Sequence, residues 1–261
     1  MAGDNTIRLI HTSDTHLGDD WRSDLAEAAF ARVIDSVAQF DADALLVVGD
    51  VFDHARVPDR VLEFYLAQIA RIDRPVVTLP GNHDLYHEES LYLRDPFQRV
   101  PPNFHLLTGS AGQTISFPEL GLDVWGRAMT QHNPEFRPLE NMPAGSDDRW
   151  LVALAHGHFH FPEDTDLRSS PIQEREVMEA SCHYLALGHW ERHCEVSRGD
   201  TSAFYSGSPL GSSPRSGHIG VNVVELDKIS GVTVTQAIVP LEGPLSLAPD
   251  AAAVAAGREE T

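Results

Sequence analysis

The chain has 261 residues, of which 42% are hydrophobic and 22% are charged, values that exclude wholesale disorder and are ordinary for a globular protein. Its 19 lysine and arginine residues and 39 aspartate and glutamate residues give a formal net charge of −20. A surface this acidic repels nucleic-acid backbones, which excludes a simple basic nucleic-acid-binding module but not an enzyme that holds phosphate through metal ions.

The first third of the chain alternates between strand and helix patterns. We expect strands over residues 7–12, 44–48 and 75–79, the last of them buried, and residues 44–48 are a continuous apolar run typical of a strand buried on both faces. Apolar residues at helical spacing predict helices over residues 24–40 and 58–72. Because each helix must return the chain to the same edge of a sheet, this order predicts parallel strands joined by right-handed crossovers.

After residue 104 the pattern changes to short segments rich in β-forming residues, several of them separated by turn residues. We expect strands over residues 113–117, 122–126, 151–155, 184–187, 203–205, 221–226 and 232–239. We also expect a helix over residues 172–180 and a long loop over residues 127–149. The fold class predicted is α/β, a four-layer helix-sheet-sheet-helix sandwich. Residues 1–245 would form one catalytic domain and residues 246–261 a flexible tail.

Polar side chains follow five of the expected strands at the points where these strands end. The first three strands run into D-T-H at residues 14–16, G-D-V-F-D at residues 49–53 and G-N-H-D at residues 81–84. Two later strands run into A-H-G-H at residues 155–158 and L-G-H-W-E at residues 187–191. Because the carboxyl ends of parallel strands meet at one rim of a sheet, we expect these side chains to converge. Unpaired polar groups in such number would be costly to bury, so the pattern indicates a ligand site.

The residue types point to a metal centre. Carboxylate, imidazole and amide groups suit Mn, Fe or Zn ions, whereas a thiolate site would need cysteines in these segments. Asp14 and His16 are two residues apart, so in an extended segment both lie on one side and hold one ion together. Asp50 follows a glycine that allows a tight turn, and its two carboxylate oxygens suit it to bridge two ions. Two metals about 3.5–4 Å apart polarise a phosphate and generate hydroxide from water.

These motifs resemble the signature of the calcineurin-like metallophosphoesterases, in which D-x-H, G-D-x-x-D and G-N-H-D precede a histidine and G-H-x-H. The first three motifs are unaltered and in order, and the resemblance covers residues 7–241. Within the family, residues 49–53, 184–189 and 205–209 are most similar to SbcD-type DNA-repair nucleases. The resemblance implies the metallophosphoesterase sandwich and hydrolysis of phosphoester bonds with two divalent metal ions. Mn or Fe is the expected metal, and Zn is a further option.

The resemblance also implies a role for each site residue. The first metal would bind Asp14, His16 and Asp50, and the second would bind Asp50, Asn82, His156 and His189. His83 would bind phosphate or donate a proton, and Asp84 would orient the His83 ring by a hydrogen bond.

The last motif departs from the family pattern, because Glu191 stands where the family has its second histidine. On an extended strand Glu191 and His193 both lie on the face of His189. We expect Glu191 to ligate the first metal, with His193 as the alternative, and a carboxylate there favours Mn or Fe over softer ions. Residues 155–158 also offer two histidines. We expect His156, which ends its strand directly, to be the ligand, with His158 as the alternative.

Two enzymatic functions fit these features. The first is hydrolysis of phosphodiester bonds by an SbcD-like nuclease, for which the family resemblance implies a DNA substrate and an ABC-type ATPase partner. The second is hydrolysis of a small phosphodiester, a phosphomonoester or a cyclic nucleotide. The net charge of −20 disfavours DNA, because polynucleotide binding needs a basic track.

The expected location is the cytoplasm. Cys182 and Cys194 are too few for a disulfide scaffold, so we expect two reduced thiols. The first residues lack a basic leader followed by an apolar core, so we expect no secretory signal. Since no apolar run approaches the roughly 20 residues that span a bilayer, we expect no membrane partner.

Overall fold

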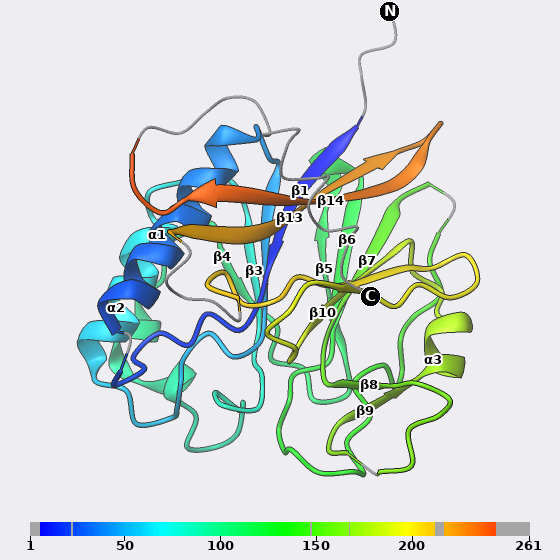
Figure 1. Ribbon diagram of the computed structural model, residues 1–261, viewed down its shortest axis with the longest axis horizontal. Coiled ribbons are helices and arrows are strands. Elements are labelled where there is room, and N and C mark those ends of the chain that lie inside the picture. The colour runs from blue at the N-terminus through cyan, green and yellow to red at the C-terminus, as the bar shows by residue number, and fades with distance from the viewer. Residues whose placement is uncertain (1–5, 22, 147, 167, 212–216, 244–261) are drawn as a thin grey trace, which may run out of the picture.

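Figure 1 shows the computed structural model, which describes residues 6–21, 23–146, 148–166, 168–211 and 217–243. Its centre is a pair of six-stranded sheets. The first sheet contains, in spatial order, β14 (Gly231–Pro240), β13 (His218–Asp227), β1 (Ile7–Thr12), β2 (Ala44–Val48), β3 (Val76–Leu79) and β4 (Phe104–Leu106). The second contains β11 (Cys194–Glu195), β12 (Ser202–Tyr205), β10 (Tyr184–Gly188), β7 (Trp150–His156), β6 (Leu122–Gly126) and β5 (Gln113–Phe117).

Each sheet has a parallel centre, with one antiparallel edge in the first sheet and two in the second. Strands β1 to β4 are parallel, as expected from the alternating pattern, and β13 pairs antiparallel with β1. In the second sheet β12, β10, β7 and β6 are parallel, and the outer strands β11 and β5 are antiparallel. A separate two-stranded sheet pairs β8 (His158–His160) with β9 (Pro171–Gln173). The parallel centres bring the carboxyl ends of β1, β2, β3, β7 and β10 to one rim.

The helices lie on the outer faces of the two sheets, so the predicted four-layer sandwich is confirmed (Figure 1). Helices α1 (Ser23–Gln39) and α2 (Asp59–Ile69) pack their apolar sides on the first sheet. The second outer layer is thin, because α3 has only the five residues Glu174–Met178. Three short 3-10 helices occupy connections, at Leu91–Leu93, Asp95–Gln98 and Pro118–Leu120. The expected tail, residues 246–261, lies outside the described residues.

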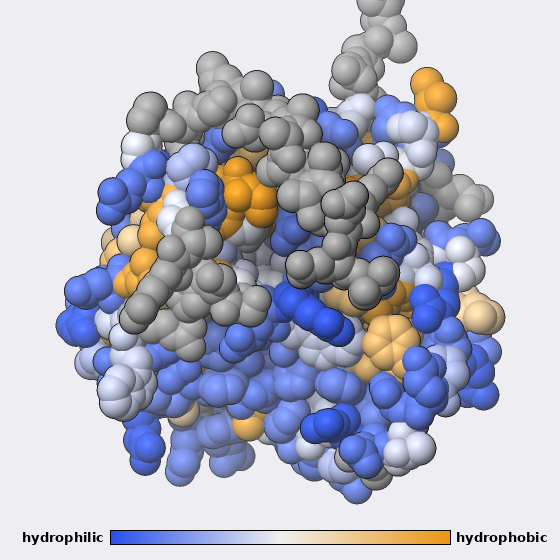
Figure 2. Space-filling model, viewed as in Figure 1, coloured by the Kyte–Doolittle hydropathy of each residue, from blue (hydrophilic) through white to orange (hydrophobic). Residues whose placement is uncertain are grey.

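Three hydrophobic clusters hold these layers together. One lies between α1, α2 and the first sheet, one between the two sheets, and one beneath α3 on the second sheet. The middle cluster contains Leu46 and Val48 of β2 facing Val152 and Leu154 of β7, all fully buried. Removing this apolar surface from water stabilises the sandwich by roughly 25 cal/mol per Å². Hydrophilic side chains cover most of the face seen in Figure 2.

One buried histidine makes the stability of this fold depend on pH. His11, in β1, is fully buried, and its Nδ1 lies 2.7 Å from the Tyr184 hydroxyl. Burial lowers the pKa of His11 to about 3, whereas an unfolded histidine has a pKa of about 6.5. Between these two pH values the unfolded chain binds one more proton at this site, so the folded state loses stability as the pH falls. This one group contributes a slope of up to about 1.4 kcal/mol per pH unit.

We therefore expect His11→Gln to flatten the pH dependence of the free energy of unfolding between pH 6.5 and 4.5. Urea unfolding followed by circular dichroism at several pH values measures this slope. The exposed His87 is the matched control, and His87→Gln should leave the slope as it is in the unmodified protein. An unchanged slope in His11→Gln would contradict this role of His11.

Candidate metal centre

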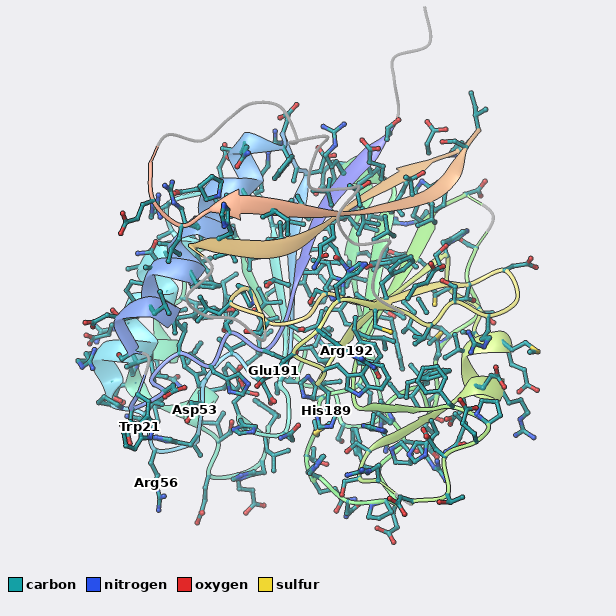
Figure 3. The ribbon with its side chains drawn as sticks, in the orientation of Figure 1. Trp21, Asp53, Arg56, His189, Glu191 and Arg192 are labelled. Carbon is teal, nitrogen blue, oxygen red and sulfur yellow. The ribbon has the colours of Figure 1, made fainter. Side chains whose placement is uncertain are left out.

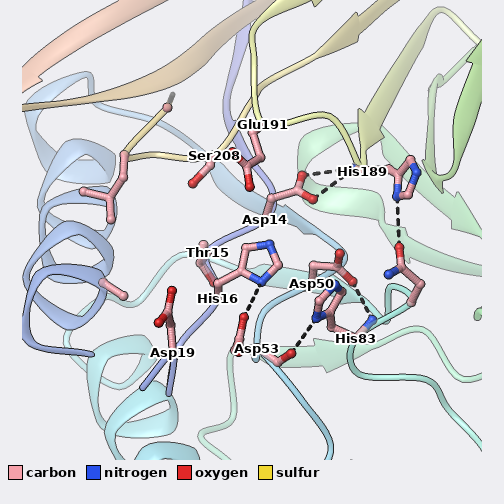
Figure 4. A pocket seen from close by; sticks show the side chains of 14 residues that line it. Asp14, Thr15, His16, Asp19, Asp50, Asp53, His83, His189, Glu191 and Ser208 are labelled. Atoms are coloured by element: carbon pink, nitrogen blue, oxygen red, sulfur yellow. Dashed lines mark hydrogen bonds and ion pairs between the residues drawn. The ribbon is translucent and has the colours of Figure 1, made fainter. Parts of the chain in front are cut away.

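The loops that follow β1, β2, β3 and β10 line a cavity of about 260 Å³, together with Ala26 of α1 and three residues after β12 (Figure 4). Seven of the nine predicted site residues line it, namely Asp14, His16, Asp50, Asn82, His83, His189 and Glu191. The other two, His156 and Asp84, are buried behind its wall. The convergence expected from the strand order is therefore present.

Asp50 lies at the centre of this cluster. Its Oδ1 accepts a hydrogen bond of 2.8 Å from the His83 backbone N–H, and its Oδ2 lies 3.3 Å from His156 Nε2. Burial alone would raise the pKa of Asp50, but the neighbouring His156 and His83 outweigh burial and hold the pKa below its ordinary value. Asp50 is thus a buried carboxylate that stays ionised and presents its two oxygens to different neighbours.

One donor group combines Asp50 with His156 and His189, whose ligand atoms all lie within 4.8 Å of one another. His156 Nδ1 is 3.0 Å from the Val48 carbonyl oxygen, which can only accept, so Nδ1 carries the proton and Nε2 is available as a ligand. The Asn82 side-chain oxygen lies 3.1 Å from His156 Nε2 and 2.9 Å from His189 Nδ1. These four residues are the set expected for the second metal.

Another donor group combines Asp50 with Asp14 and His16, whose ligand atoms also lie within 4.8 Å of one another. The Asp14 carboxylate accepts from the His189 backbone N–H at 3.0 and 3.2 Å. Burial, with the nearby Asp50 charge, raises the pKa of Asp14 to about 6. His16 Nδ1 lies 3.1 Å from Asp53 Oδ1, which leaves Nε2 as the ligand atom. These are the residues expected for the first metal, and they share Asp50 with the other group.

The backbone at this rim is strained. Asp14, His16, Asp50 and His189 have positive φ angles of 53°, 46°, 50° and 105°. Such conformations are costly for residues other than glycine and concentrate at functional sites. Backbone hydrogen bonds from Asp14 N to the Gly49 carbonyl and from His16 N to the Asp50 carbonyl hold two of them, at 3.0 and 3.1 Å.

Gly49 is required by the close approach of His156. Its φ is 78°, and a Cβ added there would lie 2.0 Å from His156 Nδ1. No side chain fits at that distance. The glycine before Asp50 therefore serves the turn, as expected from the sequence, and also makes room for the His156 ring from the other sheet.

The expected hydrogen bond from Asp84 to the His83 ring is absent, and that expectation is wrong. Asp84 Oδ1 accepts from the Gly81 backbone at 2.6 Å, and Oδ2 accepts from the Val51 backbone at 2.8 Å. Oδ2 also accepts from the Phe52 backbone and the Tyr92 hydroxyl. Asp84 therefore joins the loop after β3 to the loop after β2, which carries Asp50.

Asp53 is the neighbour of the His83 ring, and no role was predicted for it from the sequence. His83 Nδ1 donates to the Asp53 backbone oxygen, and the Asp53 carboxylate contacts His16. The second aspartate of G-D-V-F-D was the signal that could have identified it. His16, Asp53 and His83 also form a third group of donor atoms within 4.8 Å, which competes for His16 with the group of Asp14, His16 and Asp50.

The alternation argument for Glu191 does not hold, because β10 ends at Gly188 and residues 189–193 are not a strand. Glu191 nevertheless lines the cavity, as Figure 4 shows. His193 Nδ1 instead contacts Asn222 Oδ1 of β13 at 2.9 Å. Glu191 is not part of a close donor group among the described residues.

The alternative to His156 is engaged elsewhere. His158 begins β8, and its Nδ1 accepts a hydrogen bond of 3.1 Å from the Trp190 indole. Its ring also packs against His160, with 5.3 Å between ring centroids. The geometry thus brings His156, and not His158, to Asp50 and Asn82.

Comparison with known proteins identifies the family to which the chain belongs. Residues 7–191 match the family described as Calcineurin-like phosphoesterase, and the chain belongs to that family. One solved crystal structure superposes with a TM-score of 0.54 at 15% identity, covering 88% of this chain and 99% of its own, so the two share a fold.

Two relatives have names that state an activity. The chain is 27% identical over 246 residues to the SbcD component of the nuclease SbcCD of Bacillus subtilis, covering 78% of this chain and 62% of that protein. It is 24% identical over 202 residues to the 3',5'-cyclic adenosine monophosphate phosphodiesterase CpdA of Haemophilus influenzae, covering 73% and 71%. The chain thus spans less than two thirds of the length of the nuclease component.

Proposed function

We propose that the protein hydrolyses phosphodiester bonds with two divalent metal ions held at the strand-end rim. The observation that carries this proposal is that two donor groups share the buried Asp50 carboxylate within one cavity. A single carboxylate common to two ligand sets is suited to bridge a pair of adjacent metal ions. Membership of the phosphoesterase family supports the same conclusion.

The donor set fits hard or borderline divalent ions. The first ion would be held by Asp14, His16 and Asp50, and the second by Asp50, Asn82, His156 and His189. These ligands are carboxylate, amide and imidazole groups, which suit Mn, Fe or Zn. A further carboxylate from Glu191 makes Mn or Fe the metals that we propose. The free thiols Cys182 and Cys194 do not line the cavity.

The protein's own groups position the substrate and move its proton. When bound, the metal ions would polarise the substrate phosphate and activate a water molecule. His83 lines the cavity with Nδ1 fixed on the Asp53 carbonyl, so Nε2 remains to donate a proton to the leaving oxygen. Burial would lower the pKa of His83, but Asp50 and Asp53 raise it, so the ring is charged more readily than a free imidazole. Asp84 would act as a positioning residue for the Asp50 loop.

The substrate test uses protein stripped of metal and reloaded with Mn²⁺. Turnover of bis-p-nitrophenyl phosphate above that of p-nitrophenyl phosphate is the result expected of a phosphodiesterase. Single-stranded DNA, duplex DNA and 3',5'-cyclic AMP in the same panel separate the nuclease from the small-molecule alternative. Inactivity on every ester with two metals bound would contradict the proposed function.

The nuclease relative also suggests a partner. By analogy with a component of SbcCD we propose an ATPase partner, which co-purification would test. The net charge of −20 disfavours DNA as the substrate. We propose the cytoplasm as the location, on the basis of the two free thiols. Among the described residues, no helix has both the length and the apolar character needed to cross a bilayer.

The proposed role of Glu191 gives a direct test. Glu191→Ala should weaken binding at the first metal site by about 10–100-fold, the usual cost of losing a ligand or its support. Glu191→His should retain activity with an altered metal preference. Metal titration followed by mass spectrometry measures metal binding in both variants, and hydrolysis of bis-p-nitrophenyl phosphate measures their activity. His193→Ala is the matched control, because His193 contacts Asn222, and loss of metal in that variant alone would show that His193 is the ligand.

A further inference from the structure

A second cavity, of about 540 Å³, lies beside the metal cavity. The two share four wall residues, Glu191, Ser208, Leu210 and Gly211, so the cavities meet along one boundary. A substrate whose phosphate lies at the metal centre would therefore have the second cavity beside it, on the other side of Glu191. In the view of Figure 3, Glu191 separates Asp53 on one side from Arg192 on the other.

The second cavity differs in charge from the molecule as a whole. The chain carries a net charge of −20, yet Glu191, at the shared boundary, is the sole acidic side chain among the described residues that line this cavity. Arg192, His193 and His218 also line it. If Glu191 is neutralised by a metal ion, the guanidinium of Arg192 gives the remaining described wall a permanent positive charge. Such a wall suits an anion.

The Arg192 side chain packs against an aromatic ring. Its guanidinium carbon lies 5.5 Å from the centre of the Trp190 ring, and that ring stacks on Tyr205 with 4.3 Å between centroids and a 12° angle. Within the part of the chain that the structure describes, Arg192 has no carboxylate partner, whereas Arg198 pairs with Glu174. It also lies three residues after the metal-centre residue His189. An arginine held in place, with its hydrogen-bond donors uncommitted, is suited to bind phosphate.

We propose that this second cavity is an anion subsite that takes a second phosphate of the substrate, with Arg192 as its specificity-determining residue. This inference rests on the proposed function and adds the substrate class, which is linear phosphoesters with a phosphate on each side of the sugar. A 3',5'-cyclic nucleotide has one phosphate and cannot occupy both cavities. The subsite therefore favours linear nucleotides over cyclic ones.

The test compares two substrates that differ by one phosphate. Thymidine 5'-(p-nitrophenyl phosphate) is assayed with Mn²⁺ with and without a phosphate on the 3' oxygen, and kcat/KM is measured for both. We expect the 3'-phosphate to raise kcat/KM about tenfold, the size of one charge-assisted contact near the surface. Arg192→Gln should reduce that ratio toward one. Arg175→Gln, the same charge change on α3, should keep it.

Three results would overturn the proposal. These are an equal kcat/KM for both substrates in the unmodified protein, an Arg192→Gln variant that keeps the ratio, or the same loss of ratio in Arg175→Gln. A binding measurement separates the subsite from the proposed activity. Thymidine 3',5'-bisphosphate should bind the Mn²⁺-loaded protein about tenfold more tightly than thymidine 5'-phosphate in calorimetry, and only when Arg192 is present. That difference stands even if no ester is hydrolysed, whereas equal binding would overturn the subsite alone.

Discussion

Asp50→Asn is expected to abolish turnover, lowering kcat by on the order of 10⁴-fold or more, as removal of a residue central to a catalytic unit does. The bound metal should fall from two ions to one or none per chain. The reason is that Asp50 belongs to both donor groups and holds the His83 backbone through Oδ1. Asparagine is the informative replacement, because it tolerates the positive φ of 50° at this position better than alanine does.

Metal analysis and bis-p-nitrophenyl phosphate hydrolysis on the same samples measure both effects. Asp123→Asn is the matched control, since Asp123 pairs with Arg149 at 2.8 Å on β6 and does not line the metal cavity. That variant should keep two metals and normal activity. Two ions and full turnover in Asp50→Asn would remove Asp50 from its bridging role.

His83→Gln is expected to keep both metals and to lose about 10²–10⁴-fold in kcat, the range associated with a proton-transfer group. The side chain lines the cavity, its Nδ1 is held by the Asp53 carbonyl, and its ring packs edge-on against His16 with 4.9 Å between centroids. Glutamine preserves a polar side chain but cannot donate the proton of an imidazolium.

The competing assignment places a metal between His16, Asp53 and His83, whose donor atoms are also close together. If His83→Gln loses one ion, that third group is a metal site and His83 is a ligand. The exposed His87→Gln variant controls for nonspecific effects of losing a histidine, and should keep both metals and full kcat.

The pattern of the sequence predicted strands of five residues well. Strands β2, β5 and β6 have the bounds expected from their apolar or alternating runs. The expectation for residues 172–180 was partly wrong, since residues 171–173 form β9 and the helix has only five residues. Strands β4, β8, β9 and β11 were missed, because two or three residues are too few to show a periodicity.

The site could be predicted as a set of residues but not as a geometry. The parallel pairing of β1, β2 and β3 places Asp14, Asp50 and Asn82 at one rim, whereas His156 reaches them from the other sheet through the packing of the two sheets. The partner of His193 could not be predicted, since Asn222 reaches it through the pairing of β13 with β1. The burial of Asp84 among backbone N–H groups likewise depends on how two loops pack, which no local pattern encodes.

Anomalous diffraction from crystals of the Mn²⁺-loaded protein tests the central claim most directly. A two-metal centre predicts two Mn peaks about 3.5–4 Å apart, one on each side of the Asp50 carboxylate. One peak should lie among Asp14 and His16, and the other among Asn82, His156 and His189. A single peak, or a peak among His16, Asp53 and His83, would contradict it.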